Sequence, residues 1–142
     1  MAQSKKLNKG SAGQNRKASE AFVAKYQNRT DVMMTDSGLL YRIIESTDAV
    51  MPTMNDSVVV NQRILNVDGS VIADTYKTGF VDRFSLKEAI PGLQEGLQLM
   101  PIGSRFEFVI PPELAWGKRG VGNKIGPNAV LVIDIRLIEL DF

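Results

Sequence analysis

In this 142-residue chain, hydrophobic positions alternate along the segments near 39–44, 104–110 and 131–137, and residues 57–66 form a β-branched run; both patterns are typical of strands. Strands are therefore predicted at residues 37–44, 57–66, 71–73, 84–86, 104–110 and 129–140. Asp68-Gly69 predicts a tight turn between the second and third of these strands, because glycine tolerates the positive φ that such turns need. Loops are predicted at 51–56, 75–83 and 111–128.

Two segments have helical spacing instead. At residues 15–27, Phe22 and Tyr26 lie four positions apart on one face, and Asn15 is a candidate N-cap. This helix is expected to dock on the domain, with a dimerisation arm as the alternative. The second helix begins at Pro91, which suits a first turn, and it ends before Pro101 and Gly103.

Many strands and one short helix with an apolar stripe predict an α+β fold, in which the helix covers one face of the sheet. Leu93, Leu97 and Met100 form that stripe. The loop at 111–128 is long for a compact domain, and loops of that length are commonly functional.

Composition limits the chemistry. The chain has no cysteine and no histidine, so thiol nucleophiles, disulfides, zinc-finger sites and histidine acid–base catalysis are excluded. A net charge of +1 argues against a general nucleic-acid binder. Residues 1–14 are predicted to be a disordered basic tail, with weak contact to nucleic acid or anionic lipid as the alternative.

The compartment is predicted from the start of the chain. The first residues are basic and polar without an apolar core, so they do not form a secretory signal. A cytoplasmic location is expected, or a periplasmic one if a signal was removed ahead of the first residue.

Two stretches of the C-terminal half carry a family pattern, namely AIPGLQEGLQLMPIGSRFEFVIPPELAWGKRGVGN and IGPNAVLVIDIRLIEL. They resemble the FKBP family of peptidyl-prolyl cis-trans isomerases. TDSGLLYRII, after the first helix, is similar to the segment that joins domains in the Mip-like bacterial branch. The chain therefore divides into a tail at 1–14, a helix and linker at 15–36, and an FKBP-like domain at 37–142.

The resemblance implies an antiparallel half-barrel sheet wrapped around one short helix, with an apolar cleft that accepts a proline ring. It implies rotation about X–Pro bonds of proline-containing polypeptides, without a cofactor, a metal ion or a covalent intermediate. The family uses the backbone N–H at the position of Ile90 to hold a substrate carbonyl. A homodimer through the first helix is a further expectation.

Carried over position by position, the resemblance implies that Ile90, Trp116 and Ile72 act in catalysis. It implies that substrate is bound by Gln62, Asp74, Asp82, Ala89, Leu93, Lys124, Ile125 and Ile133. Several of these depart from the family pattern. Leu93 replaces a tryptophan, and Gln62 stands where the family has a tyrosine. Asp74 lies one residue after the family aspartate, which turns its side chain to the opposite face of a strand.

Two functions fit this altered cleft. The leading one is a peptidyl-prolyl isomerase that assists protein folding by stabilising the twisted amide in an aliphatic cleft. The alternative is a peptide-binding or chaperone module of the same fold with weak or no isomerase activity. The client, the preferred residue before proline, macrolide binding and the oligomeric state are left open by the sequence.

Overall fold

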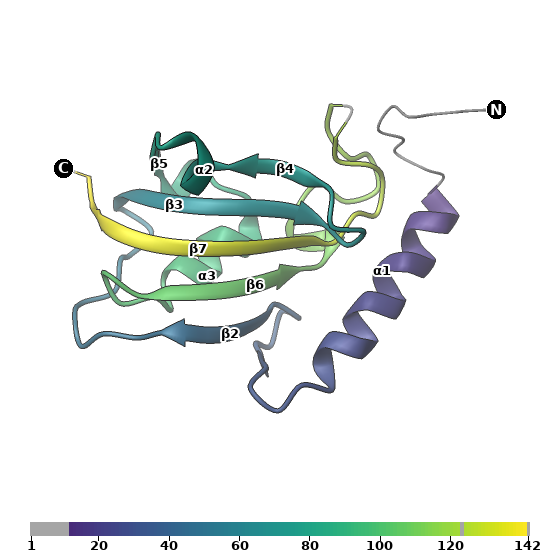
Figure 1. Ribbon diagram of the computed structural model, residues 1–142, viewed down its shortest axis with the longest axis horizontal. Helices are drawn as coiled ribbons and strands as arrows, with labels where there is room; N and C mark the ends of the chain where they lie inside the picture. Colours follow the sequence, from purple (N-terminus) through teal and green to yellow (C-terminus); the bar gives the residue numbers. More distant parts are fainter. Residues whose placement is uncertain (1–11, 123, 142) are drawn as a thin grey trace.

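The predicted antiparallel sheet is present. The computed structural model describes residues 12–122 and 124–141, so most of the predicted tail lies outside it. Seven strands form one sheet: β1 (Met33–Met34), β2 (Leu40–Glu45), β3 (Ser57–Asn66), β4 (Val71–Asp74), β5 (Asp82–Ser85), β6 (Arg105–Ile110) and β7 (Leu131–Leu140). The strand order is β1-β2-β6-β7-β3-β4, and β5 also pairs with β3 (Figure 1).

A helix lies against each face of this sheet. α3 (Pro91–Leu97) crosses one face, and α1 (Ala12–Gln27) packs on the opposite face near one end (Figure 1). Because side chains alternate along a strand, β6 serves both helices. Phe108 and Ile110 belong to the core under α3, whereas Val109 belongs to the cluster under α1.

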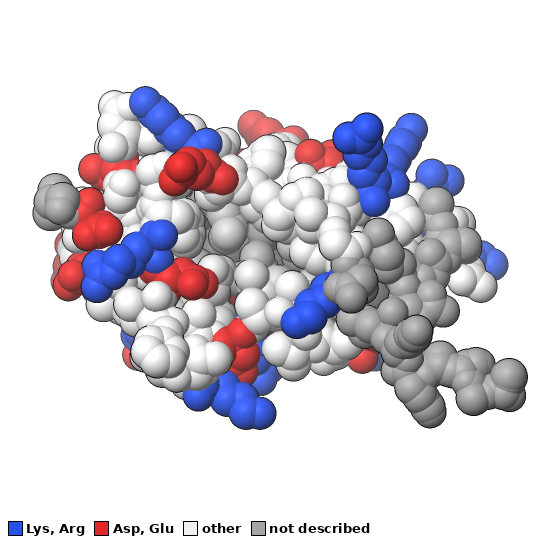
Figure 2. Space-filling view, turned by 90° about the horizontal axis from the view of Figure 1, so that it is seen from above, with Lys and Arg blue, Asp and Glu red and all other residues white. Residues whose placement is uncertain are grey.

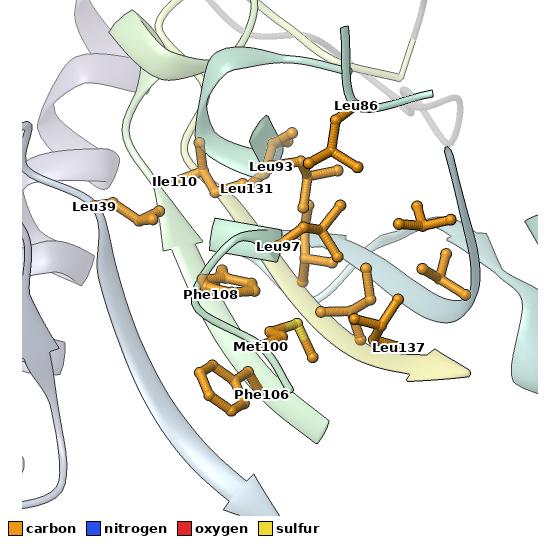
Figure 3. Close-up of a cluster of buried hydrophobic side chains, with 14 of the residues drawn as sticks. Leu39, Leu86, Leu93, Leu97, Met100, Phe106, Phe108, Ile110, Leu131 and Leu137 are labelled. Atoms are coloured by element: carbon orange, nitrogen blue, oxygen red, sulfur yellow. The ribbon is translucent and has the colours of Figure 1, made fainter. Parts of the chain in front are cut away.

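The main core fills the space between α3 and the sheet (Figure 3). The predicted stripe of Leu93, Leu97 and Met100 is fully part of it. The helix approaches β6 closely, because a Cβ on Gly96 would lie 2.7 Å from the Phe108 ring. A Cβ on Gly92 would lie 2.5 Å from Ile110 Cγ2. Glycine at these two positions therefore sets the distance between α3 and the sheet.

The segment between β4 and β5 differs from the predicted loop at 75–83. It contains the short helix α2 (Thr75–Thr78), for which the Asp74 carboxylate is the N-cap and accepts from Lys77 N. The strand predicted at 84–86 spans residues 82–85 instead, because Phe84 pairs with Val58 and Asp82 with Val60. A 3-10 turn, η1 (Leu86–Glu88), follows it.

The first helix begins earlier than predicted. It starts at Ala12, so Asn15 lies inside the helix and is not its N-cap. Its side chain instead donates from Nδ2 to the Pro127 carbonyl at 2.8 Å. Phe22 and Tyr26 share a face as predicted, with ring centroids 6.0 Å apart. Tyr26 is only 6% exposed, so this face is docked on the chain's own sheet.

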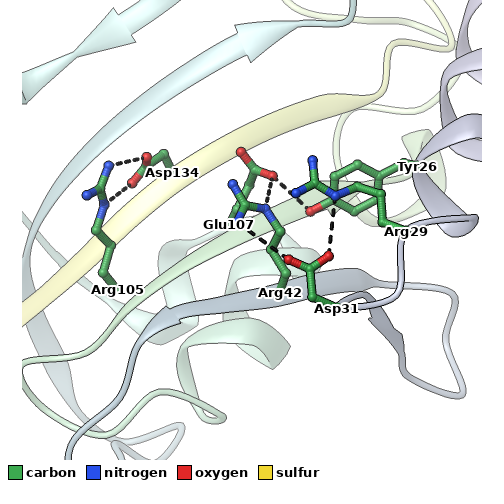
Figure 4. Close-up of polar contacts among 7 residues, drawn as sticks. All are labelled: Tyr26, Arg29, Asp31, Arg42, Arg105, Glu107 and Asp134. Atoms are coloured by element: carbon green, nitrogen blue, oxygen red, sulfur yellow. Dashed lines mark hydrogen bonds and ion pairs between the residues drawn. The ribbon is translucent and has the colours of Figure 1, made fainter.

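Polar contacts fasten the end of α1 to the sheet (Figure 4). Glu107 Oε1 accepts from the Tyr26 hydroxyl at 2.9 Å and from Arg42 Nε at 2.8 Å. Burial, and then the nearby Glu107 carboxylate, raise the pKa of Tyr26 above its usual value. Further along β6, Arg105 makes a two-pronged pair with Asp134 on the neighbouring β7, at 2.9 and 2.6 Å. In the described part of the chain, we find no helix long and apolar enough to cross a membrane.

Candidate functional site

An open cleft of about 260 Å³ lies between the sheet and α3. Its lining is mostly apolar, and ligand pockets generally combine such a surface with a few polar groups. The lining consists of Gln62, Ile64, Ile72, Phe84, Glu88, Ala89, Ile90, Leu93, Trp116, Ile125, Leu131 and Ile133.

The sheet supplies one wall of the cleft from four different strands. Ile64 on β3 pairs with Ile133 on β7 and lies beside β4, which carries Ile72. β5 adds Phe84 through its pairing with Val58. Inward-facing residues of paired strands thus meet at one place, although they are far apart in the sequence.

The opposite wall comes from the turn that leads into α3. Ile90 precedes Pro91 and is extended, with φ −62° and ψ 152°, as the residue before a proline prefers. Its carbonyl accepts from Leu93 N at 2.9 Å and from Gln94 N at 3.0 Å. The Ile90 N–H, in contrast, has no acceptor among the described residues. A backbone donor is therefore available at the edge of an apolar cleft.

The 111–128 loop closes one end of the cleft with Trp116 and Ile125. Trp116 is 38% exposed, whereas Ile125 is buried. The loop has a 3-10 turn, η2 (Pro112–Leu114), and an isolated bridge between Val121 and Ile125. Gly120, at φ 68°, has no room for a side chain, because a Cβ there would lie 2.3 Å from the Ile125 carbonyl oxygen.

Gln62 is the polar point in the sheet wall. It is 6% exposed, and its Nε2 donates to Asp82 Oδ2 at 3.0 Å. Since an ionised carboxylate only accepts, Asp82 orients the amide so that Oε1 points away from it. Oε1 is buried and has no partner in the described part of the chain.

Charge is sparse inside the cleft. Within the described lining, Glu88 is the only titratable side chain, and its carboxylate accepts from Ser85 Oγ at 3.0 Å. Figure 2 looks onto the side of the molecule that carries α2, β4 and the 111–128 loop, where charged groups surround a largely uncharged centre. The arrangement suits gripping an apolar group and holding a carbonyl, not moving a proton.

The structure brings together most of the site residues that were expected from the sequence. Those that line the cleft are Ile72, Ile90, Trp116, Gln62, Ala89, Leu93, Ile125 and Ile133. Three others lie outside the lining. Asp74 caps α2, Asp82 reaches the cleft only through Gln62, and Lys124 Nζ donates to the Ile72 carbonyl at 3.4 Å.

Sequence reasoning missed four lining residues, namely Ile64, Phe84, Glu88 and Leu131. A signal existed for two of them. Ile64 shares the inward face of residues 57–66, and Leu131 shares the predicted inward face of residues 129–140. Phe84 and Glu88 depend on how β5 and η1 cross the end of the cleft, which alternation does not show.

Comparison with protein families gives two matches. Residues 49–138 match the FKBP-type peptidyl-prolyl cis-trans isomerase family, and residues 1–43 match the domain amino terminal to FKBP-type peptidyl-prolyl isomerase. Among curated proteins, the chain is 37% identical over 129 residues to the outer membrane protein MIP of Legionella longbeachae. That match covers 91% of this chain and 55% of the relative.

FkpA, an FKBP-type peptidyl-prolyl cis-trans isomerase of Escherichia coli, is 36% identical over 95% of this chain and 49% of its own length. The chain thus spans about half the length of these curated relatives. The crystal structure of Escherichia coli FkpA superposes with a TM-score of 0.87, covering 92% of this chain and 61% of that one. A peptidyl-prolyl cis-trans isomerase from Pseudomonas syringae superposes with a TM-score of 0.85 at 27% identity, covering 94% and 98%.

Proposed function

This chain belongs to the FKBP-type peptidyl-prolyl cis-trans isomerase family, and we propose that its cleft catalyses rotation about X–Pro bonds and so assists protein folding. The observation that carries the proposal is the position of an unpaired backbone donor, Ile90 N–H, at the edge of the apolar cleft. A proline ring needs an apolar recess, and the carbonyl before it needs a donor.

The chemistry requires no proton transfer. Resonance makes the peptide bond planar and places a barrier of about 18–20 kcal/mol on its rotation. An enzyme lowers that barrier by binding the twisted amide better than either planar form. An apolar wall that excludes water disfavours the more polar planar amide, and a fixed donor stabilises the carbonyl as it turns.

We assign three residues to the reacting bond. The Ile90 amide holds a substrate carbonyl, while Ile72 and Trp116 contact the ring from the sheet and from the loop. The ring rests among Leu93, Ile125 and Ile133, which come from α3, the loop and β7. Proline-containing polypeptides are the substrates under this proposal. Asp82 contributes by orienting Gln62.

A protease-coupled assay on a panel of X–Pro peptides tests the activity. We expect rates above the uncatalysed rate, and a kcat/KM about three- to tenfold lower in Trp116→Ala, because an aromatic contact with the ring is lost. Val121→Ala is the matched control, since Val121 is 44% exposed on the same loop but does not line the cleft. Uncatalysed rates for every peptide would refute the enzyme, and unchanged activity in Trp116→Ala would refute the site.

A binding or chaperone role is the second candidate, and exposed apolar groups favour it. Phe80 is 80% exposed, and Tyr76 and Val81 are exposed on the same segment. Large exposed apolar groups commonly mark protein-binding surfaces. Suppressed aggregation of a client without proline, lost in Phe80→Ser, would support this role. An unchanged aggregation rate would exclude it.

Assembly and compartment are part of the same proposal. We propose that the chain acts on polypeptides as a monomer, with the homodimer through α1 as the alternative. One relative is named an outer membrane protein, which favours the periplasmic expectation over the cytoplasmic one. Cell fractionation of the full-length natural protein decides between the two compartments.

A further inference from the structure

The amino-terminal helix is joined by hydrogen bonds to the loop that closes the cleft. Ser19 Oγ donates to the Asn128 carbonyl at 2.9 Å, and both residues are less than a tenth exposed. One turn earlier on α1, Asn15 Nδ2 donates to the Pro127 carbonyl at 2.8 Å. Both bonds span more than 100 residues of sequence.

The contact continues from Asn128 to the residue beside Trp116. Asn128 N donates to the Gly117 carbonyl at 2.8 Å, and Gly117 N donates to the Pro112 carbonyl at 2.8 Å. Asn128 is held on one side by α1 and on the other by the loop, in a left-handed conformation at φ 57°. Asparagine is one of the few residues other than glycine that adopt this conformation readily, so it suits the turn at this position.

The rest of the loop depends on few regular contacts. Between η2 and β7, the described residues contain only turns and the Val121–Ile125 bridge. α1 and the start of the loop also enclose an open pocket of about 460 Å³, so they do not pack continuously. Trp116 is held within the loop by Gly120 N, which donates to its carbonyl at 3.2 Å, and its neighbour Gly117 is joined to α1 through Asn128.

We propose that Ser19 is a positioning residue for the cleft, because its hydroxyl holds the Asn128 carbonyl and thereby fixes Gly117 and Trp116. This inference rests on the proposed function for its effect on turnover, but the structural coupling stands apart from catalysis. Any event that lifts α1 from the sheet would then loosen the loop and weaken the grip on a substrate.

The test uses the full chain and Trp116, which is the only tryptophan. In Ser19→Ala, acrylamide is expected to quench Trp116 fluorescence more strongly, and hydrogen exchange at the amides of residues 117 and 128 is expected to accelerate. The kcat/KM for an X–Pro peptide should fall about two- to tenfold, as expected for one lost hydrogen bond. Ser19→Thr, which keeps the hydroxyl, should restore all three values.

Tyr26→Phe is the matched control. It loosens the other end of α1 by removing the bond to Glu107, but leaves the contact with Asn128 intact. It is expected to leave Trp116 quenching unchanged. If Ser19→Ala does not fold, Asn15→Ala tests the same junction through the Pro127 carbonyl.

Normal quenching and exchange in Ser19→Ala would overturn the proposal whatever its activity. Equal effects of Ser19→Ala and Tyr26→Phe would also overturn it, because the effect would then come from the helix as a whole. If the wild-type chain proves inactive, the proposed function fails, but the quenching and exchange results still decide the coupling.

Discussion

At the residue scale, the side chain at position 93 differs from the family pattern in a way that can be tested by mutation. Leu93 lines the cleft from α3, at the position where the family pattern has a tryptophan. A flat aromatic ring offers a proline more contact area than a leucine does. The cleft volume of about 260 Å³ leaves room for a larger side chain.

Leu93→Trp is therefore expected to raise kcat/KM severalfold in the protease-coupled assay. Leu99→Trp is the matched control, because Leu99 packs against the same core but does not line the cleft. Urea unfolding of both variants separates cleft effects from stability. A folded Leu93→Trp protein with unchanged or lower kcat/KM would show that the ring does not rest on this residue.

A second residue-scale prediction concerns Tyr26 and alkaline pH. Its folded pKa is raised above the unfolded value of 10.0, first by burial and then by Glu107, so folding favours the neutral phenol. The stability linked to it is complete below pH 10 and is lost as the pH rises through the folded value. Tyr76 behaves similarly, because burial raises its pKa to about 12.

The free energy of unfolding of the wild type should therefore fall as the pH rises above the unfolded value of 10.0, and less steeply in Tyr26→Phe. Near neutral pH this variant should lose about 1–3 kcal/mol, as expected for a bond to a carboxylate. Chemical denaturation over that pH range provides the measurement. Parallel curves for the two proteins would mean that Tyr26 ionises equally easily in both states.

At the scale of elements, glycine decides how closely α3 approaches the sheet. A Cβ at Gly96 would lie 2.7 Å from the ring of Phe108, which is fully buried among other core side chains, so the packing would have to shift. Gly96→Ala should therefore destabilise the protein by about 1–3 kcal/mol through overpacking. It should also lower kcat/KM, because Ile90 and Leu93 move with the helix.

Gly13→Ala is the opposite case in another helix. A Cβ there meets no atom within 4 Å, so alanine only adds helix propensity. We expect a gain of about 0.5–1 kcal/mol in the free energy of unfolding. Thermal and urea unfolding of both variants compare the two sites. If both substitutions changed the free energy of unfolding in the same direction, the close packing of α3 against the sheet would be contradicted.

The predictable elements were those with long periodic signals. The β-branched run of residues 57–66 predicted both ends of β3, and Pro91 marked the first turn of α3. The short helix α2 was not predicted, because it consists of four residues held by the Asp74 cap and has no apolar periodicity. The bounds of β5 were predicted as 84–86 and are 82–85, because its pairing with β3 decides where it begins and ends.

The lining residues of the cleft were likewise predictable only where they lie in segments with a strong sequence pattern. Residues such as Ile90 and Ile133 come from segments with strong motifs, so their convergence was expected. Phe84 and Glu88 come from β5 and the following turn, whose course was not predicted. The bond from Ser19 to Asn128 joins segments 109 residues apart and leaves no pattern in the sequence.

At the scale of the whole molecule, α1 covers an apolar patch on the outer face of the sheet. Leu40, Val109, Val130 and Val132 are buried there together with Tyr26. Fully exposing an aliphatic side chain costs about 1.5–3 kcal/mol, so this cover contributes substantially to stability. Without α1, this apolar patch would be exposed to solvent and would also promote association between copies of the chain.

Removing residues 1–30 should therefore lower the midpoint of urea unfolding and cause self-association, while the full chain stays monomeric in light scattering. The shortened chain keeps Asp31 beside Arg42, so the loss can be assigned to α1 and not to that ion pair. A dimerisation arm predicts the reverse, because its loss would turn a dimer into a monomer. A full chain of twice the monomer mass that becomes monomeric on shortening would therefore show that α1 serves assembly and that its docking on its own sheet is secondary.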